Sequence, residues 1–193
     1  CFSYLENTVL IAQLKSENEV PELTDECDRF CRYVQRIIGA VVTVGIGQVC
    51  GRLTGLAQSY SSAREAVSYR VIYGVSRAIN MKEIAEGLEG KVVMVTGAAG
   101  SIGSELCRQL TRFNIKQLIF LDSAETPMHN IQLEFTDKFP KTPFVPVIGD
   151  VRSLDRMDFV FRNYHPQVVF HAAAYKHVPL MEENPCEAVL VNV

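Results

Sequence analysis

The sequence predicts an α/β protein in which a parallel sheet follows a small α+β segment. From about residue 88 onward, short apolar runs typical of buried strands alternate with stretches whose apolar residues recur every three or four positions, as in helices. Alternating strands and helices form parallel sheets with right-handed crossovers. With 193 residues, 48% of them hydrophobic, the chain is long enough for two small domains. We expect one over 1–79 and one over 80–193.

The first segment has the pattern strand, helix, strand, helix. The expected strands cover 7–14 and 40–47. The first helix carries apolar residues from Leu23 to Ile38 and ends at Gly39, and the second carries Tyr60 to Val71 and ends at Gly74. This pattern predicts a compact α+β unit.

Three glycines in this segment imitate a nucleotide-binding loop. The third, Gly51, follows Gly45 and Gly47 one position too late, and no helical pattern begins for several residues. We interpret them as a strand end and a turn. The segment contains no histidine and no cluster of acids, so we expect neither a metal site nor acid–base chemistry there.

The second segment contains four expected strands separated by helices. The strands cover 92–96, 117–122, 144–149 and 167–171. The helices cover 102–113, about 128–139 and 154–164, and a last helix begins near Pro185. These elements make up at least half of a Rossmann-type parallel sheet.

The most informative motif joins the first of these strands to its helix. Gly97, Gly100 and Gly103 are spaced by three and lie between the apolar run 92–96 and a helical pattern. A pyrophosphate needs backbone N–H groups at a helix N-terminus and no Cβ in its way, which glycine provides. We therefore predict a dinucleotide site.

An acidic residue strengthens this prediction and favours one cofactor. Asp122 ends the second strand, 19 residues after Gly103, where a carboxylate can accept both ribose hydroxyls. It would repel a 2′-phosphate, so NAD is favoured over NADP. NADP stays open, because Arg152 and Lys116 cannot be placed from the sequence and a basic residue nearby would reverse the preference.

Two further strand ends carry candidate ligand contacts. Asp150 and Val151 follow the third strand, where they would receive adenine or form a turn or N-cap before the next helix. After the fourth strand, small residues permit close approach of a cofactor, and polar residues follow within reach of a substrate. His171 has either a structural or a chemical role there, and Lys176 with His177 would contact an anionic or polar ligand or remain in solvent.

Composition excludes several function classes. The net charge of −3 is spread without a basic stripe, which argues against nucleic-acid binding. No apolar run is long enough to cross a membrane and no signal-peptide pattern opens the chain, so we expect a cytoplasmic location. The six cysteines lack CxxC spacing, so we expect no metal and no disulfide. The first residue, Cys1, and the apolar run 188–193 suggest a piece of a longer chain.

Five motifs follow one another in residues 81–193. They are TGAAGSIG at 96–103, DSAETP at 122–127, GDVR at 149–152, HAAAYKHVP at 171–179 and the segment 182–188. In this order they resemble the motifs of the extended short-chain dehydrogenases of surface and capsular polysaccharide biosynthesis, in particular the nucleotide-sugar 4,6-dehydratases that act on UDP-N-acetylglucosamine.

The resemblance implies a role for each matching position. It implies that pyrophosphate is held by Gly97, Gly100, Ser101, Ile102 and Gly103, and that ribose is held by Asp122. It implies that adenine is received by Asp150 and Val151 and that the cofactor is lined by Ala172, Ala173 and Ala174. The side chains that it places toward the nicotinamide and the sugar are Lys176, His177 and Asn192.

The resemblance also implies the reaction and its limits in this chain. Hydride leaves the sugar C4 for the nicotinamide, water is lost across C5 and C6, and hydride returns to C6. The family's Ser/Thr-Asp-Lys segment and Tyr-x-x-x-Lys pair fall beyond residue 193. We therefore expect a UDP-sugar as the family's substrate, no catalytic residue within residues 1–193, and at most cofactor affinity.

Residues 1–79 resemble a different family. The segments 7–12, 42–47 and 59–70 are similar to the later part of the degenerate GGDEF-like domain of response regulators with AraC-type DNA-binding domains. The chain has no GGDEF signature, so we expect this part to be noncatalytic. Two hypotheses follow: a nucleotide-sugar dehydratase or epimerase fragment joined to a noncatalytic segment, or a signalling module that forms a homo-oligomer through its N-terminal part.

Overall fold

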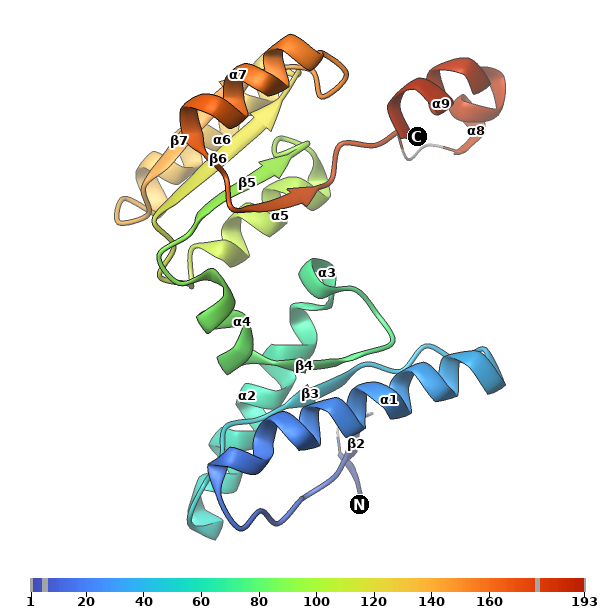
Figure 1. The fold of residues 1–193 in the computed structure, drawn as a ribbon, viewed down its shortest axis with the longest axis vertical. Helices are drawn as coiled ribbons and strands as arrows, with labels where there is room; N and C mark the ends of the chain where they lie inside the picture. Colours follow the sequence, from blue (N-terminus) through green and yellow to red (C-terminus); the bar gives the residue numbers. More distant parts are fainter. Residues whose placement is uncertain (1, 5–6, 176–177, 193) are drawn as a thin grey trace. The chain divides into compact units, whose positions relative to one another are not determined.

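The computed structural model describes residues 2–4, 7–175 and 178–192. The chain divides into two compact units, Cys1–Met81 and Lys82–Val193 (Figure 1). Each unit is described by itself.

The described strands of the first unit form two short pairs. Strand β1 (Phe2–Tyr4) is antiparallel to β2 (Asn7–Val9), and β3 (Val44–Ile46) is parallel to β4 (Ala78–Asn80). The strands expected over 7–14 and 40–47 are therefore too long. The apolar run after β2 lies in solvent, with Leu10 67% exposed, and β3 pairs with β4 over three residues only. Strand β4 was not predicted, because three residues are too few to display a period.

Both helical segments of the first unit end where glycine predicts. A 3₁₀ turn (Glu17–Glu19) leads into α1 (Val20–Ile38), and Gly39 ends α1 with φ +72°. A second 3₁₀ turn (Leu53–Gly55) leads into α2 (Leu56–Ser68). The buried Tyr69 separates α2 from α3 (Arg70–Tyr73), which ends at Gly74 with φ +87°. The single helix expected here is thus broken into two.

The two glycines of β3 and its end are explained by helix packing. A Cβ on Gly45 would lie 2.0 Å from the Ala63 carbonyl oxygen, and one on Gly47 would lie 2.1 Å from that of Ser59. Only glycine lets α2 approach this strand so closely. The packing accounts for these residues without a ligand, in line with their interpretation as a strand end.

The second unit contains a four-stranded parallel sheet. Its strands are β5 (Val92–Thr96), β6 (Gln117–Asp122), β7 (Phe144–Ile148) and β8 (Val168–His171), in the order β7-β6-β5-β8. Each begins and ends within one residue of its prediction. The order is that of the first four strands of a Rossmann sheet, so the predicted fold class is confirmed.

Helices cover the two faces of this sheet because its strand residues are apolar on both. Helix α7 (Leu154–Tyr164) packs on one face, where Val160 joins Met94, Ile119 and Val147 in a buried cluster. On the other face, Phe120 meets Phe135 of α6 (Glu125–Lys138) with ring centroids 4.7 Å apart.

The remaining helices of this unit include two that were not predicted, α4 (Met81–Leu88) and α8 (Val178–Glu183). Helix α5 (Ser101–Leu110) ends three residues earlier than expected, since the Thr111 hydroxyl donates to the Arg108 carbonyl and the chain turns there. Helix α9 (Pro185–Asn192) begins at the predicted residue. No described helix is long and apolar enough to cross a membrane.

Candidate functional site

The strand order places the site at the carboxyl edge of the second unit's sheet. From β5 the chain moves outward to β6 and β7, and it then returns across α7 to β8 on the other side of β5. The order therefore reverses between β5 and β8. Open α/β sheets bind ligands beyond the carboxyl ends of their strands at such a reversal. The loops after β5 and β8 are the two sides of this position.

The loop after β5 can form only because two of its residues are glycine. Gly97 has φ +66°, and a Cβ there would lie 2.6 Å from the Ala172 carbonyl oxygen. A Cβ on Gly103 would lie 2.0 Å from the Gly97 carbonyl oxygen. Gly97 thus packs on the segment after β8, and Gly103 lets α5 start directly against the turn.

The third glycine of the loop is different, because it is not needed for packing. A Cβ on Gly100 would have one close neighbour, the Gly97 carbonyl oxygen at 3.2 Å. Gly100 is the N-cap residue of α5, and no side chain caps the helix there. The N-terminus of a helix attracts anions through its N–H groups and its dipole. The backbone at Gly100 is therefore open on the side where a Cβ would lie, and Ser101 and Ile102, both exposed, form the first turn of α5; we call this loop the glycine cradle.

Asp122 connects the end of β6 to the same loop. Its carboxylate oxygens accept hydrogen bonds from the N–H groups of Ala99, at 3.0 Å, and Ala124, at 2.9 Å. Each carboxylate oxygen has a second lone pair that is available to another donor. Among the described residues, Asp122 makes no ion pair, so its charge at this edge is not cancelled by a cation.

Asp150 follows the next strand, β7, and its carboxylate accepts hydrogen bonds from Arg152. Arg152 donates to its carboxylate through Nη2, at 2.7 Å, and Nε, and through its own backbone N–H. These bonds hold the pKa of Asp150 below its ordinary value. Arg152 also lies 3.6 Å from Glu187 of α9. Ser153, and not Asp150, caps α7, so of the two structural interpretations Asp150 takes the turn.

Val151 and Gly149 attach this turn to the sheet. Val151 is half-buried and packs against the core beneath α7. The Gly149 N–H donates to the Asp122 carbonyl at 2.9 Å, which places the two acidic turns side by side. The Arg156 guanidinium donates to the Ile148 carbonyl and covers Gly149.

The segment after β8 lies against the glycine loop. The Ala172 N–H donates to the Thr96 carbonyl at 3.0 Å, and the peptide that joins Ala172 to Ala173 faces Gly97. Ala174 is exposed. The structure thus brings Ala172 and Ala173 against Gly97, because β5 and β8 are neighbouring parallel strands.

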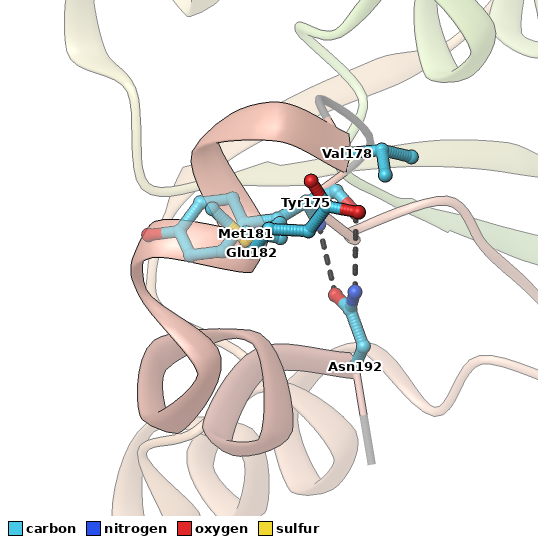
Figure 2. Close-up of a pocket in the computed structure, with 5 residues that line it drawn as sticks. All are labelled: Tyr175, Val178, Met181, Glu182 and Asn192. Carbon is cyan, nitrogen blue, oxygen red and sulfur yellow. Dashed lines mark hydrogen bonds between the residues drawn. The ribbon is translucent and has the colours of Figure 1, made fainter.

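Beyond these alanines the chain is anchored by Asn192. Its side-chain amide accepts from the Tyr175 N–H at 2.9 Å and donates to the Tyr175 carbonyl at 3.1 Å (Figure 2). A hollow of about 290 Å³ lies beside this pair and is lined by Tyr175, Val178, Met181, Glu182 and Asn192. The predicted Lys176 and His177 lie outside the described residues.

Three residues of this edge were not assigned a partner by sequence reasoning. Thr96 pairs with His171, Arg152 holds Asp150, and Arg156 caps β7. Only the basic character of Arg152, two residues after an acid, is a signal in the sequence. The other two depend on which strands lie side by side.

The described residues contain no group of three metal-binding side chains. Their cysteines are free thiols; Cys31 and Cys107 are buried, and burial raises the pKa of Cys107 far above its ordinary value.

Together, the strand order, the glycine cradle and the acid at the end of β6 define a Rossmann-type α/β unit. A family model described as "Polysaccharide biosynthesis protein" matches residues 93–193, and the chain belongs to this family. A second model, "GGDEF-like domain", matches residues 2–69. Both resemblances inferred from the sequence are confirmed.

Three curated relatives match the second unit. The probable polysaccharide biosynthesis protein EpsC of Bacillus subtilis is 47% identical over 116 residues, which are 60% of this chain and 19% of EpsC. The capsular polysaccharide biosynthesis protein CapD of Staphylococcus aureus is 43% identical over the same shares. The UDP-N-acetylglucosamine 4,6-dehydratase (inverting) of Campylobacter jejuni is 32% identical over 54% of this chain and 30% of that protein. The chain thus spans about a fifth of the first two relatives.

Proposed function

We propose that the chain is the cofactor-binding part of an NAD(P)-dependent nucleotide-sugar 4,6-dehydratase or epimerase of surface polysaccharide biosynthesis. The observation that carries the proposal is the glycine cradle at the reversal of strand order, with Asp122 beside it. The names of the relatives support the substrate class, a UDP-sugar, and the pathway class.

The cofactor we propose is NAD. Asp122 offers free lone pairs to the ribose hydroxyls and would repel a 2′-phosphate. Neither Lys116 nor Arg152, the two cations that could have favoured a 2′-phosphate, is suited to reverse the preference for NAD over NADP. Lys116 precedes β6 and so lies at the amino end of that strand, and Arg152 is held by Asp150 and Glu187. NADP is the alternative that the experiment below compares.

In this proposal the residues of the edge hold the dinucleotide in sequence. The pyrophosphate lies over Gly97, Gly100 and Gly103 and the first turn of α5, the ribose at Asp122, and the adenine at Asp150 and Val151. Ala172, Ala173 and Ala174 would face the nicotinamide half, and we assign Lys176, His177 and Asn192 to the sugar side because the family resemblance implies it. The nicotinamide ring supplies reversible hydride acceptance. We assign no catalytic residue within this chain, so it binds the cofactor without turnover.

A titration of the 193-residue chain with NAD⁺ and with NADP⁺ by calorimetry tests the proposal. We expect NAD⁺ to bind more tightly than NADP⁺. Gly100→Val places a branched side chain in the cradle and abolishes binding of both, while the far-UV circular dichroism stays unchanged. Gly87→Val, on the exposed surface of α4, is the matched control and binds as the parent does. A parent chain that binds neither cofactor would refute the proposal.

For the first unit we propose a noncatalytic role. Its match to a GGDEF-like domain, without the GGDEF signature, favours a second candidate function for the whole chain, a signalling module that self-associates through this unit. Sedimentation of the full chain and of a chain that lacks residues 1–79 distinguishes the two. A dimer lost on deletion, without any nucleotide binding, favours the signalling module. A cytoplasmic location belongs to the enzyme proposal, since nucleotide sugars and nicotinamide cofactors are cytoplasmic metabolites.

A further inference from the structure

A side-chain hydrogen bond joins the two central strands at the reversal of strand order. Thr96 ends β5, His171 ends β8, and the two residues are direct partners in the parallel register. The Thr96 hydroxyl and His171 Nδ1 are 2.6 Å apart. Thr96 is 3% exposed, whereas the His171 side chain is exposed. The bond therefore links a fixed, buried group to a group at the rim.

The residues that follow this pair are those on which the cofactor site depends. One position later, β5 continues into Gly97 and β8 into Ala172. The Ala172 N–H donates to the Thr96 carbonyl at 3.0 Å, and Gly97 packs on the Ala172 carbonyl. The pair is thus the last side-chain connection between the strands before their loops separate.

We propose that Thr96 and His171 are positioning residues that hold the segment 172–174 against the glycine loop and thereby set the affinity for the nicotinamide half of a dinucleotide. This inference rests on the proposed function. A segment that is already ordered before the ligand arrives adds no ordering cost to binding, so the binding free energy is more favourable. Without the bond, each encounter would have to order that segment.

The adenine half of the site offers an internal reference. Asp122 and Asp150 lie at the ends of β6 and β7, on the side of β5 that faces away from β8. AMP occupies only this half, whereas NAD⁺ reaches both. Loss of the pair should therefore weaken NAD⁺ and leave AMP unchanged, whereas a general loss of folding would weaken both equally.

The test compares four variants of the full chain with the parent. Thr96→Val removes the hydroxyl at constant size, and Thr96→Ser keeps it. His171→Ala removes the imidazole at an exposed site, so folding is retained, and His171→Asn restores a polar atom near the position of Nδ1. Thr111→Val, which removes a hydroxyl bonded to the Arg108 carbonyl elsewhere in the unit, is the matched control. AMP and NAD⁺ are titrated by NMR, with thermal unfolding as a check.

We expect Thr96→Val and His171→Ala each to weaken NAD⁺ about three- to tenfold, the range that one hydrogen bond supports. AMP binding should stay within about twofold of the parent, and Thr96→Ser, His171→Asn and Thr111→Val should bind NAD⁺ as the parent does. The inference is overturned if AMP weakens as much as NAD⁺, if Thr96→Val binds NAD⁺ normally, or if only the His171 variants lose affinity, which would mean direct contact. If the parent binds AMP and NAD⁺, and Thr96→Val and His171→Ala bind both ligands as the parent does, this inference alone is overturned. A parent that binds neither overturns the proposed function as well.

Discussion

At the scale of single residues, Asp122 has two roles. Its carboxylate accepts hydrogen bonds from the N–H groups of the glycine loop and of the turn before α6, and in our proposal it also accepts hydrogen bonds from the ribose hydroxyls. We predict that Asp122→Ala weakens NAD⁺ by about 1–3 kcal/mol, the cost of losing a hydrogen bond to a charged acceptor. NADP⁺ should weaken less, because the repulsion of its 2′-phosphate disappears with the carboxylate.

Calorimetric titrations of parent and variant with both cofactors measure this difference. An equal loss for the two cofactors would mean that Asp122 acts only by holding the loop. In that case the unfolding free energy of the variant should fall while the preference for NAD⁺ stays constant.

What the sequence could predict about these residues depends on how local their signal is. The role of Asp122 follows from its spacing to Gly103, because both lie in one βα unit. The Thr96–His171 bond joins residues 75 positions apart, and it exists only because β8 returns to the side of β5. For Asp150 the sequence left two interpretations open, an adenine contact and a turn or cap. The hydrogen bond from the Arg152 guanidinium to its carboxylate depends on the shape of the turn, which the sequence does not show.

At the scale of elements, two glycines at the junction of β5 and α5 have different roles: Gly103 is required by the packing, and Gly100 leaves space for the proposed ligand. We predict that Gly103→Ala destabilises the second unit, because its Cβ would meet the Gly97 backbone carbonyl at 2.0 Å and neither can yield. Gly100→Ala should leave stability unchanged within about 0.5 kcal/mol, the usual range for surface changes, and weaken NAD⁺. Urea unfolding of both variants measures this. Equal stability of the two would contradict the assigned roles.

Helices α5 and α6 are joined by a paired ion bridge whose strength depends on pH. Arg108 Nε and Nη2 each lie 2.9 Å from a different oxygen of Glu134. The arginine lowers the pKa of Glu134 below its ordinary value of 4.5. A lowered carboxyl pKa in the folded state means that the stabilisation is present above that ordinary value and is lost as the pH falls through the folded-state pKa.

We therefore predict that Glu134→Gln lowers the unfolding free energy at pH 7 by about 0.5–1 kcal/mol, the range for partly exposed pairs with two parallel bonds. The difference from the parent should vanish at acidic pH. Asp158→Asn, which breaks the exposed pair with Arg162, is the control and should cost less. Denaturant unfolding at pH 7 and at low pH distinguishes these outcomes, and a constant difference across this range would argue against the bridge.

The elements that the sequence predicted best are those with their own boundary signals. Helix α7 matches its prediction at both ends, since Ser153 caps it and His165 leaves the helix with φ +48°. Strands β2 and β3 were overestimated, because an apolar run is a strand only where a neighbouring strand supplies hydrogen bonds. Helix α8 was missed because its six residues are too few to display a helical period.

At the scale of the whole molecule, the chain combines units with different relatives. The family models match residues 2–69 and 93–193, and the boundary between the compact units falls in the chain between Met81 and Lys82. The first unit supplies none of the side chains that we assign to the dinucleotide. The prediction of two domains, 1–79 and 80–193, came from the repeating strand–helix pattern that begins near residue 88. The short β4 and α4 before that point show no such pattern.

Because the proposed site is built entirely from the second unit, NAD⁺ should protect that unit alone. Hydrogen exchange of the full chain, measured with and without NAD⁺, should slow at the amides around Gly100, Asp122, Asp150 and Ala172, which line the proposed site. Ligand binding stabilises what it contacts and any segment that unfolds together with it. Amides of 7–68 should exchange at the same rate in both states, and NADP⁺ at equal concentration should protect less. Protection that extends into 7–68 would mean that the two units unfold as one, and protection absent from the glycine loop would place the ligand elsewhere.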